Sequence, residues 1–74
     1  MNKIIWIDTD HPLALAARTQ VMPRGYEIGI SERDMEPIAE WVKETGIGRR
    51  TSFDTIKFKN KADMSMFLLR WSNH

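Results

Sequence analysis

The pattern of hydrophobic and polar positions changes period several times along this chain, and each period predicts a different element. Residues 3–8 contain an unbroken run of β-branched and aromatic side chains at positions 4–7, which predicts a strand buried on both faces. Residues 26–30 alternate apolar with polar or small side chains, which predicts a half-buried strand. Residues 52–59 also alternate, with Ile56 and Phe58 on one face. We therefore expect about three strands.

A spacing of 3.6 residues predicts a helix in the middle of the chain. One stripe collects the apolar positions Met35, Ile38, Ala39 and Val42, and Trp41 flanks it. A stripe of this width is typical of a helix that packs one side against a core.

The ends of this helix follow from capping chemistry. A proline inside a helix removes a backbone hydrogen bond, so Pro37 argues that the helix begins near Asp34 and not after Ser31. Gly46 is the expected left-handed residue after the last turn, and Ile47 is the hydrophobic contact that usually follows it.

A last helix is expected over residues 61–71, with Asn60 as its N-cap and Asp63 near its positive end. Its apolar residues fall on two nearly opposite faces, which are Ala62, Met66 and Leu69 on one side and Met64, Phe67, Leu68 and Trp71 on the other. One thin sheet covers only one of these faces. The second face needs the other helix, a second copy of the chain or a partner.

Residues 12–22 leave two alternatives open. They form either a short helix capped by Asp10, with Pro12 in its first turn, or the return strand of a hairpin that ends near Met22. We favour the helix. The expected fold over residues 1–74 is then a single α/β domain, or α+β, of about three strands packed by two or three helices.

Composition narrows the class of protein. The chain has 74 residues, of which 42% are hydrophobic and 28% charged, and no cysteine, so disulfides and thiolate chemistry are excluded. No apolar run approaches the roughly 20 residues that span a bilayer, and Asp8 and Asp10 interrupt any signal-peptide pattern. We expect a cytoplasmic domain without membrane contact.

The first candidate catalytic residues are Asp8 and Asp10, at the end of the first expected strand. They resemble the first motif of haloacid-dehalogenase-type phosphatases, in which two such carboxylates act as nucleophile and acid/base and hold magnesium. The motif has Thr or Val where this chain has Pro12, and the chain lacks the strands and further ligands of that family. We therefore expect a strand end and a turn.

Other catalytic or metal-binding arrangements also lack support. Asp8, Asp10, His11 and His74 are suitable ligand types for a divalent metal, but their spacing is not specific. With one internal histidine and no cysteine, no catalytic triad is available. We expect no enzyme, no cofactor and no metal.

Charge is unevenly distributed. The net charge is +1, but residues 1–37 carry four basic and six acidic side chains (net −2) and residues 38–74 carry seven and four (net +3). Five basic residues of the second half form a candidate ridge for nucleic-acid phosphates, namely Arg49, Arg50, Lys57, Lys59 and Lys61. The alternative is that they are the solvated face of an edge strand.

The C-terminal part resembles a known group of proteins. Trp41-Val42, Gly46-Ile47-Gly48, Phe53 and residues 56–71, above all Phe67-Leu68-Leu69-Arg70-Trp71, are similar to the end of small uncharacterised accessory proteins of tailed bacteriophages. The resemblance covers less than half of the chain. It implies a factor that acts in the infected host cell, often by binding a host protein, and it carries over no catalytic residue.

The leading hypothesis is therefore a non-enzymatic phage accessory protein that occludes or redirects a host or phage macromolecule, with a host or phage protein as the expected partner. We expect it to self-associate through its last helix, as a possible homodimer. Aromatic side chains and Arg dominate the energetics of protein interfaces. The candidate contact residues are Trp41, Phe67, Arg70 and Trp71. The second hypothesis is a small nucleic-acid-binding protein that uses the basic ridge.

Overall fold

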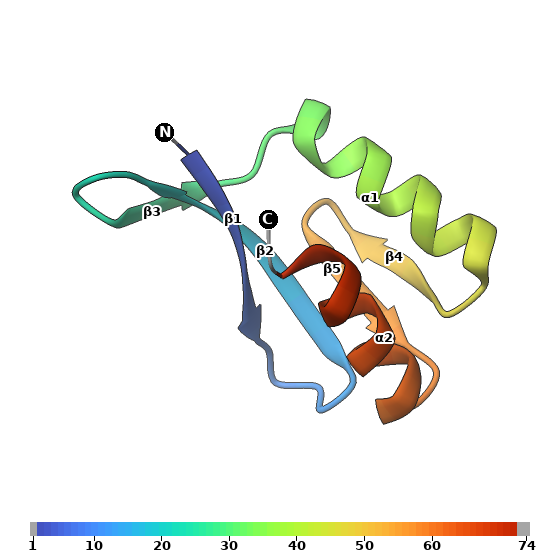
Figure 1. Ribbon diagram of the computed structural model, residues 1–74. Coiled ribbons are helices and arrows are strands. Elements are labelled where there is room, and N and C mark those ends of the chain that lie inside the picture. The colour runs from blue at the N-terminus through green and yellow to red at the C-terminus, as the bar shows by residue number, and fades with distance from the viewer. Residues whose placement is uncertain (1, 73–74) are drawn as a thin grey trace.

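The chain folds into one antiparallel sheet and two helices, an α+β architecture (Figure 1). The computed structural model describes residues 2–72. Along the chain the elements are β1 (Asn2–Asp8), β2 (Ala14–Val21), β3 (Tyr26–Gly29), α1 (Glu32–Thr45), β4 (Gly48–Ser52), β5 (Thr55–Phe58) and α2 (Lys61–Trp71). The expectation of mixed helices and strands is confirmed, but the expected number of about three strands is wrong, because the sheet has five.

Strand β2 organises the sheet. The strand order is β1-β2-β5-β4, and β3 also pairs with β2. On one side, residues Leu15 to Val21 of β2 pair with β1. On the other side its first part, Ala14 to Ala16, pairs with β5, and its second part, Arg18 to Val21, pairs with β3. The sheet therefore divides into a β4–β5 half and a β3 half around one central strand.

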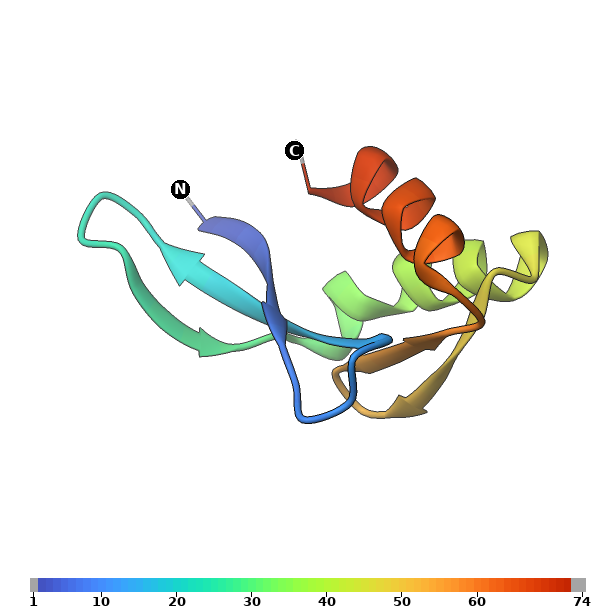
Figure 2. The same cartoon turned by 90° about the horizontal axis from the view of Figure 1, so that it is seen from below.

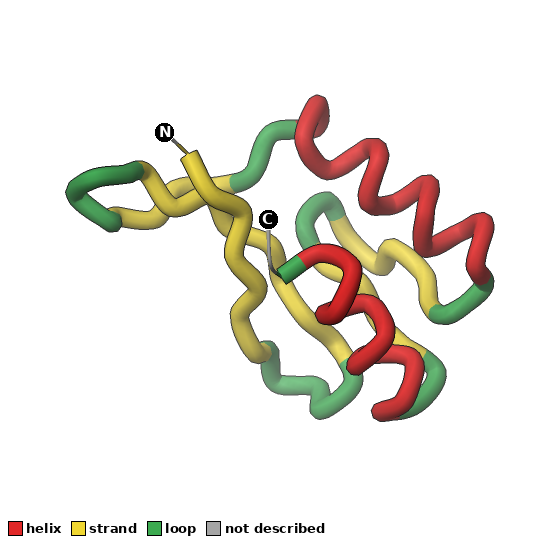
Figure 3. The backbone as a smooth tube through the Cα atoms, viewed as in Figure 1, coloured by secondary structure: helices red, strands yellow, loops and turns green. Residues whose placement is uncertain are grey.

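Both helices lie on the same face of this sheet, and the opposite face has no helix on it (Figures 2 and 3). The core between the helices and the sheet consists of Leu15, Ala17, Ile30, Met35, Ile38, Val42, Ile47, Ile56, Phe58 and Phe67. Strand β1 is confirmed, but its expected burial on both faces is wrong: Ile5 and Ile7 on the open face are only half-buried.

The favoured helix over residues 12–22 is wrong, and the alternative return strand is right. The segment ALAARTQV is rich in alanine, which favours a helix in isolation. In the folded chain it is β2, whose backbone groups pair with three neighbouring strands. Tertiary pairing of this extent overrides the local preference of the alanines.

The expected strand over residues 52–59 is shorter in the structure: β5 covers only Thr55–Phe58, and Ser52 is the last residue of β4. Residues 53–54 form a turn, so the segment around Arg49 and Arg50, read from the sequence as a linker, is β4 of a β4–β5 hairpin. The register shifts between Arg50 and Ser52. Such a bulge breaks the strict alternation on which the reading of the sequence relied.

Helix α1 confirms the predicted stripe and corrects the predicted start. Met35, Ile38 and Val42 are buried. Ser31 is the N-cap, because its hydroxyl accepts a hydrogen bond from the Asp34 N–H at 3.2 Å, and Pro37 lies inside the helix.

The local disadvantage of this proline is offset by the cap and by the burial of the whole stripe. At the other end Gly46 is left-handed, with φ of 69°, as predicted, and Ile47 is buried.

Helix α2 has the predicted bounds and the predicted cap. Asn60 Oδ1 accepts a hydrogen bond from the Asp63 N–H at 2.8 Å. Phe67 is fully buried against the sheet. On the opposite face Met66 and Leu69 are 53% and 77% exposed. This confirms that one sheet covers only one of the two apolar faces.

Candidate functional site

The β2–β3 hairpin extends beyond both helices, and we call residues 18–29 the wing (Figures 1 and 2). Strand β3 was expected to be half-buried, but all four of its residues are exposed. Three large apolar side chains are exposed in this hairpin, namely Met22 (41%), Tyr26 (54%) and Ile28 (46%). The half-burial prediction is wrong because no helix extends over this part of the sheet.

The wing presents its apolar side chains on the face that carries the helices elsewhere. Directly opposed residues of an antiparallel pair point to the same face. Ile4 opposes Thr19, which in turn opposes Ile28, and Val21 opposes Tyr26. Because Thr19 is buried on the core side, Ile28 and Tyr26 continue the core face of the sheet into solvent.

A groove adjoins this exposed face. It has a volume of about 400 Å³ and lies between the start of β1, α1 and the end of α2. Its lining residues are Asn2, Lys3, Ile4, Ile38, Arg70 and Trp71. Groove and wing meet at Ile4, which lines the groove and lies in the same cross-strand row as Ile28. We call Ile4, Tyr26, Ile28, Arg70 and Trp71 the docking surface.

The end of α2 forms one wall of the docking surface. The Arg70 guanidinium lies over the Trp71 ring, 4.3 Å from its centroid. Trp41 meets Trp71 edge-on, with ring centroids 6.1 Å apart. The half-buried Trp71 is thus supported from the core side by one aromatic ring and covered from outside by a cation.

The structure separates the four predicted contact residues. Arg70 and Trp71 belong to the docking surface, whereas Trp41 is half-buried against the core. Phe67 is at the centre of the core, in contact with the rings of Trp6, Trp41 and Phe58, and has no exposed surface. We therefore no longer count Phe67 among the contact residues.

Sequence reasoning missed the wing residues. The alternation of Tyr26 and Ile28 with polar or small residues was a correct signal for one apolar face. Nothing in the sequence indicated that this face has no layer above it. The uncovered face follows from the fold, in which two helices cover only part of a five-stranded sheet.

Charge on the docking surface has one sign. Arg70 lines the groove, and among residues 2–72 no carboxylate does. Lys3 also lines it, but Lys3 alternates with Ile4 along β1, so its side chain leaves the opposite face of the sheet. The arrangement favours a partner segment with an apolar face and acidic side chains next to it.

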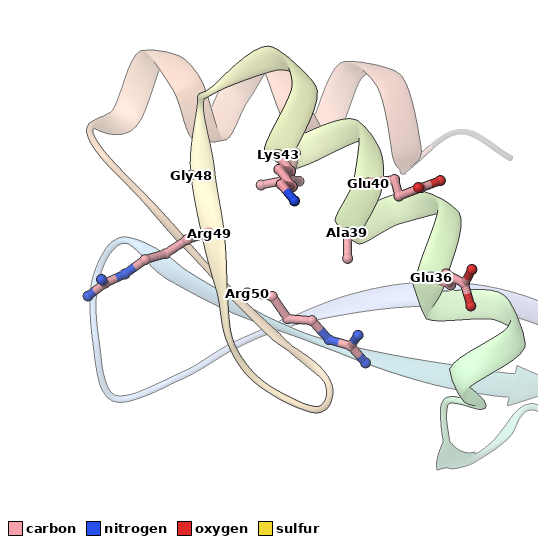
Figure 4. A pocket seen from close by; sticks show the side chains of 8 residues that line it. Glu36, Ala39, Glu40, Lys43, Gly48, Arg49 and Arg50 are labelled. Atoms are coloured by element: carbon pink, nitrogen blue, oxygen red, sulfur yellow. The ribbon is translucent and has the colours of Figure 1, made fainter.

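A second groove runs between α1 and the edge strand β4, with a volume of about 450 Å³ (Figure 4). Its walls carry both signs of charge, including Glu36, Glu40 and Lys43. Arg50 Nη2 donates a hydrogen bond to Glu32 Oε1 at 2.6 Å. The charges in this groove therefore compensate one another.

The Arg50–Glu32 pair shifts both groups. The hydrogen bond from Arg50 lowers the pKa of the Glu32 carboxyl, and the same bond raises the pKa of Arg50. Arg50 also donates to the Phe53 carbonyl oxygen and lies over the Phe53 ring. The Arg50 guanidinium therefore contacts groups of the same chain, Glu32 and Phe53.

A second ion pair fixes the centre of the open face. Arg18 Nη1 donates to Asp54 Oδ2 at 2.6 Å. Partial burial raises the pKa of Asp54, but hydrogen bonds from Arg18 and Thr55 together outweigh burial and leave that pKa below its ordinary value. Asp54 is therefore held as a carboxylate.

The predicted basic ridge is only partly assembled. Arg49 opposes Lys57 in the β4–β5 ladder, and Lys59 follows two residues later. Arg50 points away from Arg49, on the opposite side of β4 (Figure 4). Lys61 is exposed in the first turn of α2 and does not line the groove that holds Arg49, Lys57 and Lys59.

The residues after β1 form a tight loop. Thr9 Oγ1 donates to the Ala14 carbonyl, and the Leu13 N–H donates to His11 Nδ1 at 3.0 Å. Among residues 2–72, no three histidine or acidic side chains gather into a possible metal site. His74 lies outside the described residues.

Comparisons with known proteins add no family to these observations: no protein-family model, curated protein or solved structure matches the chain. Within residues 2–72, neither helix is long and apolar enough to cross a membrane.

Proposed function

We propose that this chain is a small non-enzymatic binding protein whose docking surface holds an acidic, amphipathic segment of a partner protein. The observation that carries the proposal is the uncovered part of the sheet. The face that buries the core under α1 and α2 continues into the wing, where Tyr26 and Ile28 are exposed. Large exposed apolar patches on small proteins typically mark interaction sites.

The residue types support protein binding. Tyr, Trp and Arg are the side chains that most often dominate interface energies, and the docking surface has one of each, in Tyr26, Trp71 and Arg70. Trp71 is held by its ring contact with Trp41, so it loses little freedom when a partner binds.

The shape of the site favours a helix as the bound segment. α1 and α2 occupy the same face of the sheet, and neither extends over the wing (Figure 2), where Tyr26 and Ile28 are exposed. A helix from a partner would complete the layer and cover Ile4 and Ile28, with acidic side chains next to Arg70.

The origin of the partner is part of the same proposal. The resemblance of residues 56–71 to accessory proteins of tailed bacteriophages stays a prediction, and under it the partner is a host or phage protein. The distinctive end of that resemblance, Arg70 and Trp71, lies on the docking surface. This placement supports a link between the docking surface and the resemblance to phage accessory proteins.

Two synthetic peptides test the proposed chemistry. Both are amphipathic helices with the same apolar face, and they differ only in flanking side chains, Glu in one and Lys in the other. We expect the Glu peptide to bind about tenfold more tightly by fluorescence anisotropy, because Arg70 attracts it.

Charge reversal supplies the control. Arg70→Glu should remove the preference for the Glu peptide, whereas Lys43→Glu, on α1 outside this groove, should leave the preference in place. Equal binding of the two peptides, or equal effects of the two substitutions, would contradict the proposal.

A further inference from the structure

A third groove lies at a corner of the open face, far from the docking surface in the sheet. It has a volume of about 510 Å³ and forms where residues 11–13 meet the β4–β5 hairpin. The side chains of His11, Arg49, Lys57 and Lys59 line it, and we call it the basic groove. Leu13, Gly48 and Phe58 complete its lining.

The ladder positions the cations of the basic groove. Arg49 and Lys57 are directly opposed, so their side chains leave the same face of the hairpin. Arg50 opposes Ile56, a core residue, and so belongs to the other face. Lys59 follows Lys57 at the spacing of two residues that returns to the same face of an extended chain.

Charge in this groove is uncompensated. Of the residues that the structure describes, no acidic one lines this groove. Within residues 2–72, Arg49, Lys57 and Lys59 make no ion pair, whereas Arg18 and Arg50 are each paired with a carboxylate. The fold thus neutralises two of its arginines and leaves these three cations open to solvent in one hollow.

His11 adds a donor of fixed direction. Its Nδ1 accepts a hydrogen bond from the Leu13 N–H, so in the neutral ring the proton is on Nε2. The groove therefore offers one N–H donor and three cationic side chains, the chemistry that binds phosphate oxygens.

We propose that the basic groove binds the phosphate groups of a nucleic-acid backbone. A backbone supplies several phosphates in a row, which matches three cations spread over two strands. The two rings considered for stacking on bases, those of Phe53 and Trp41, do not line the basic groove: Phe53 lies under Arg50, and Trp41 packs against the core. The contact is therefore electrostatic and independent of base sequence.

The proposal goes beyond the docking of a partner protein and does not depend on it. The docking surface lies on the helix-bearing face, while Arg49 and Lys57 lie on the open face. Failure of either proposal leaves the other standing.

A salt titration tests the proposal. A labelled duplex of generic sequence is bound to the whole chain, and the affinity is followed by anisotropy from 50 to 200 mM salt. With about three phosphates neutralised, log K should fall against log salt with a slope of about −2.7, a loss of about 40-fold. No binding at the lowest salt, or a slope near zero, would overturn the proposal.

Single charge removals sharpen the test. Arg49→Gln and Lys57→Gln should each reduce the slope by about 0.9, so that the loss over the same range becomes about 12-fold. Lys43→Gln, an equal loss of charge on α1, should leave the slope unchanged. Equal slopes for all three variants would contradict a contact at this groove.

Inorganic phosphate separates the sources of the anion. It should compete with the duplex only weakly, because one phosphate engages few of the three cations. If inorganic phosphate binds and the duplex does not, the assignment to nucleic acid is wrong.

Discussion

At the scale of single residues, two features allow specific predictions: the close approach of β4 to β5 at Gly48, and the Arg18–Asp54 ion pair. A Cβ on Gly48 would lie 2.5 Å from the Lys57 carbonyl oxygen, a backbone atom that cannot move aside without opening the β4–β5 hairpin. Gly48 therefore allows β4 to approach β5 as closely as it does.

Gly48→Ala should lower the free energy of unfolding by roughly 1–3 kcal/mol, the usual cost of forcing an extra methyl group into a packed site. The matched control is Gly29→Ala, because a Cβ at Gly29 meets no atom within 4 Å. Urea denaturation of both variants checks the prediction. A similar stability for the two variants would show that the hairpin absorbs the methyl group.

The Arg18–Asp54 pair predicts a dependence on pH. Since the pKa of Asp54 is lowered by folding, the stability from this pair is complete above the ordinary carboxyl pKa of 3.8 and is lost as the pH falls through the lower folded value. Both partners are about one-third exposed, so the pair contributes only roughly 0.5–1 kcal/mol.

Asp54→Asn should therefore lower the free energy of unfolding by that amount at neutral pH, and by nothing at an acidic pH low enough to protonate the carboxyl group in the folded chain. Denaturation of the variant and the natural chain at both pH values checks this. A difference that persists at the lower pH would assign the effect to the Thr55 contact or to packing.

At the scale of elements, helix α1 begins earlier than the sequence predicts. Ser31 begins α1 although Pro37 then falls inside the helix, because the early start gives the first turn a side-chain cap. An N-cap hydrogen bond of this kind is worth about 1 kcal/mol.

Ser31→Ala should accordingly lower the free energy of unfolding by about 1 kcal/mol. Ser65→Ala, at an exposed position inside α2, should leave it unchanged or raise it slightly, since alanine is the better helix former. Thermal unfolding of the two variants distinguishes them. If both behave alike, α1 does not depend on its cap.

The elements that were predicted correctly carry their own local signals. Gly46 marks the end of α1 because glycine, without a Cβ, adopts the left-handed conformation at no steric cost. Asn60 marks the start of α2 because its side chain accepts a hydrogen bond from the Asp63 N–H. α2 was predicted with its correct bounds for this reason. The spacing of apolar residues predicted the buried stripe of α1 and the two apolar faces of α2, but not which of these two faces is exposed.

The elements that were missed depend on partners distant in the sequence. Residues 14–21 form a strand because β1, β3 and β5 all pair with them, and no window of the sequence contains those partners. The docking surface was half predicted: Arg70 and Trp71 were named, but Tyr26 and Ile28 were taken as half-buried. Which faces lack a covering layer is a property of the assembled fold.

At the scale of the whole molecule, apolar side chains of residues 2–72 lie outside the core on two surfaces that involve α2. One is the docking surface, and the other is the outer face of α2 with Ala62, Met66 and Leu69. A standard interface covers about 800 Å² on each partner, far more than three side chains on one helix offer. Self-association through α2 should therefore be weak.

We expect a monomer–dimer equilibrium that Leu69→Lys shifts to monomer by about tenfold or more, because Leu69 is the most exposed large apolar side chain. Phe53→Lys, an exposed aromatic position in the β4–β5 turn, should leave the equilibrium unchanged. Sedimentation velocity over a range of concentrations measures both. A dimer that tolerates Leu69→Lys would place the interface elsewhere.

Site-specific photo-crosslinking in cells tests the central claim most directly, that the wing and the end of α2 dock a partner protein. A photoreactive residue replaces Tyr26 in one variant and Phe53 in the other, two aromatic positions of almost equal exposure, 54% and 53%. We predict that position 26 captures one partner through an acidic, amphipathic segment identified by mass spectrometry, and that position 53 does not. Equal capture at both positions, or capture of this chain alone, would contradict the account.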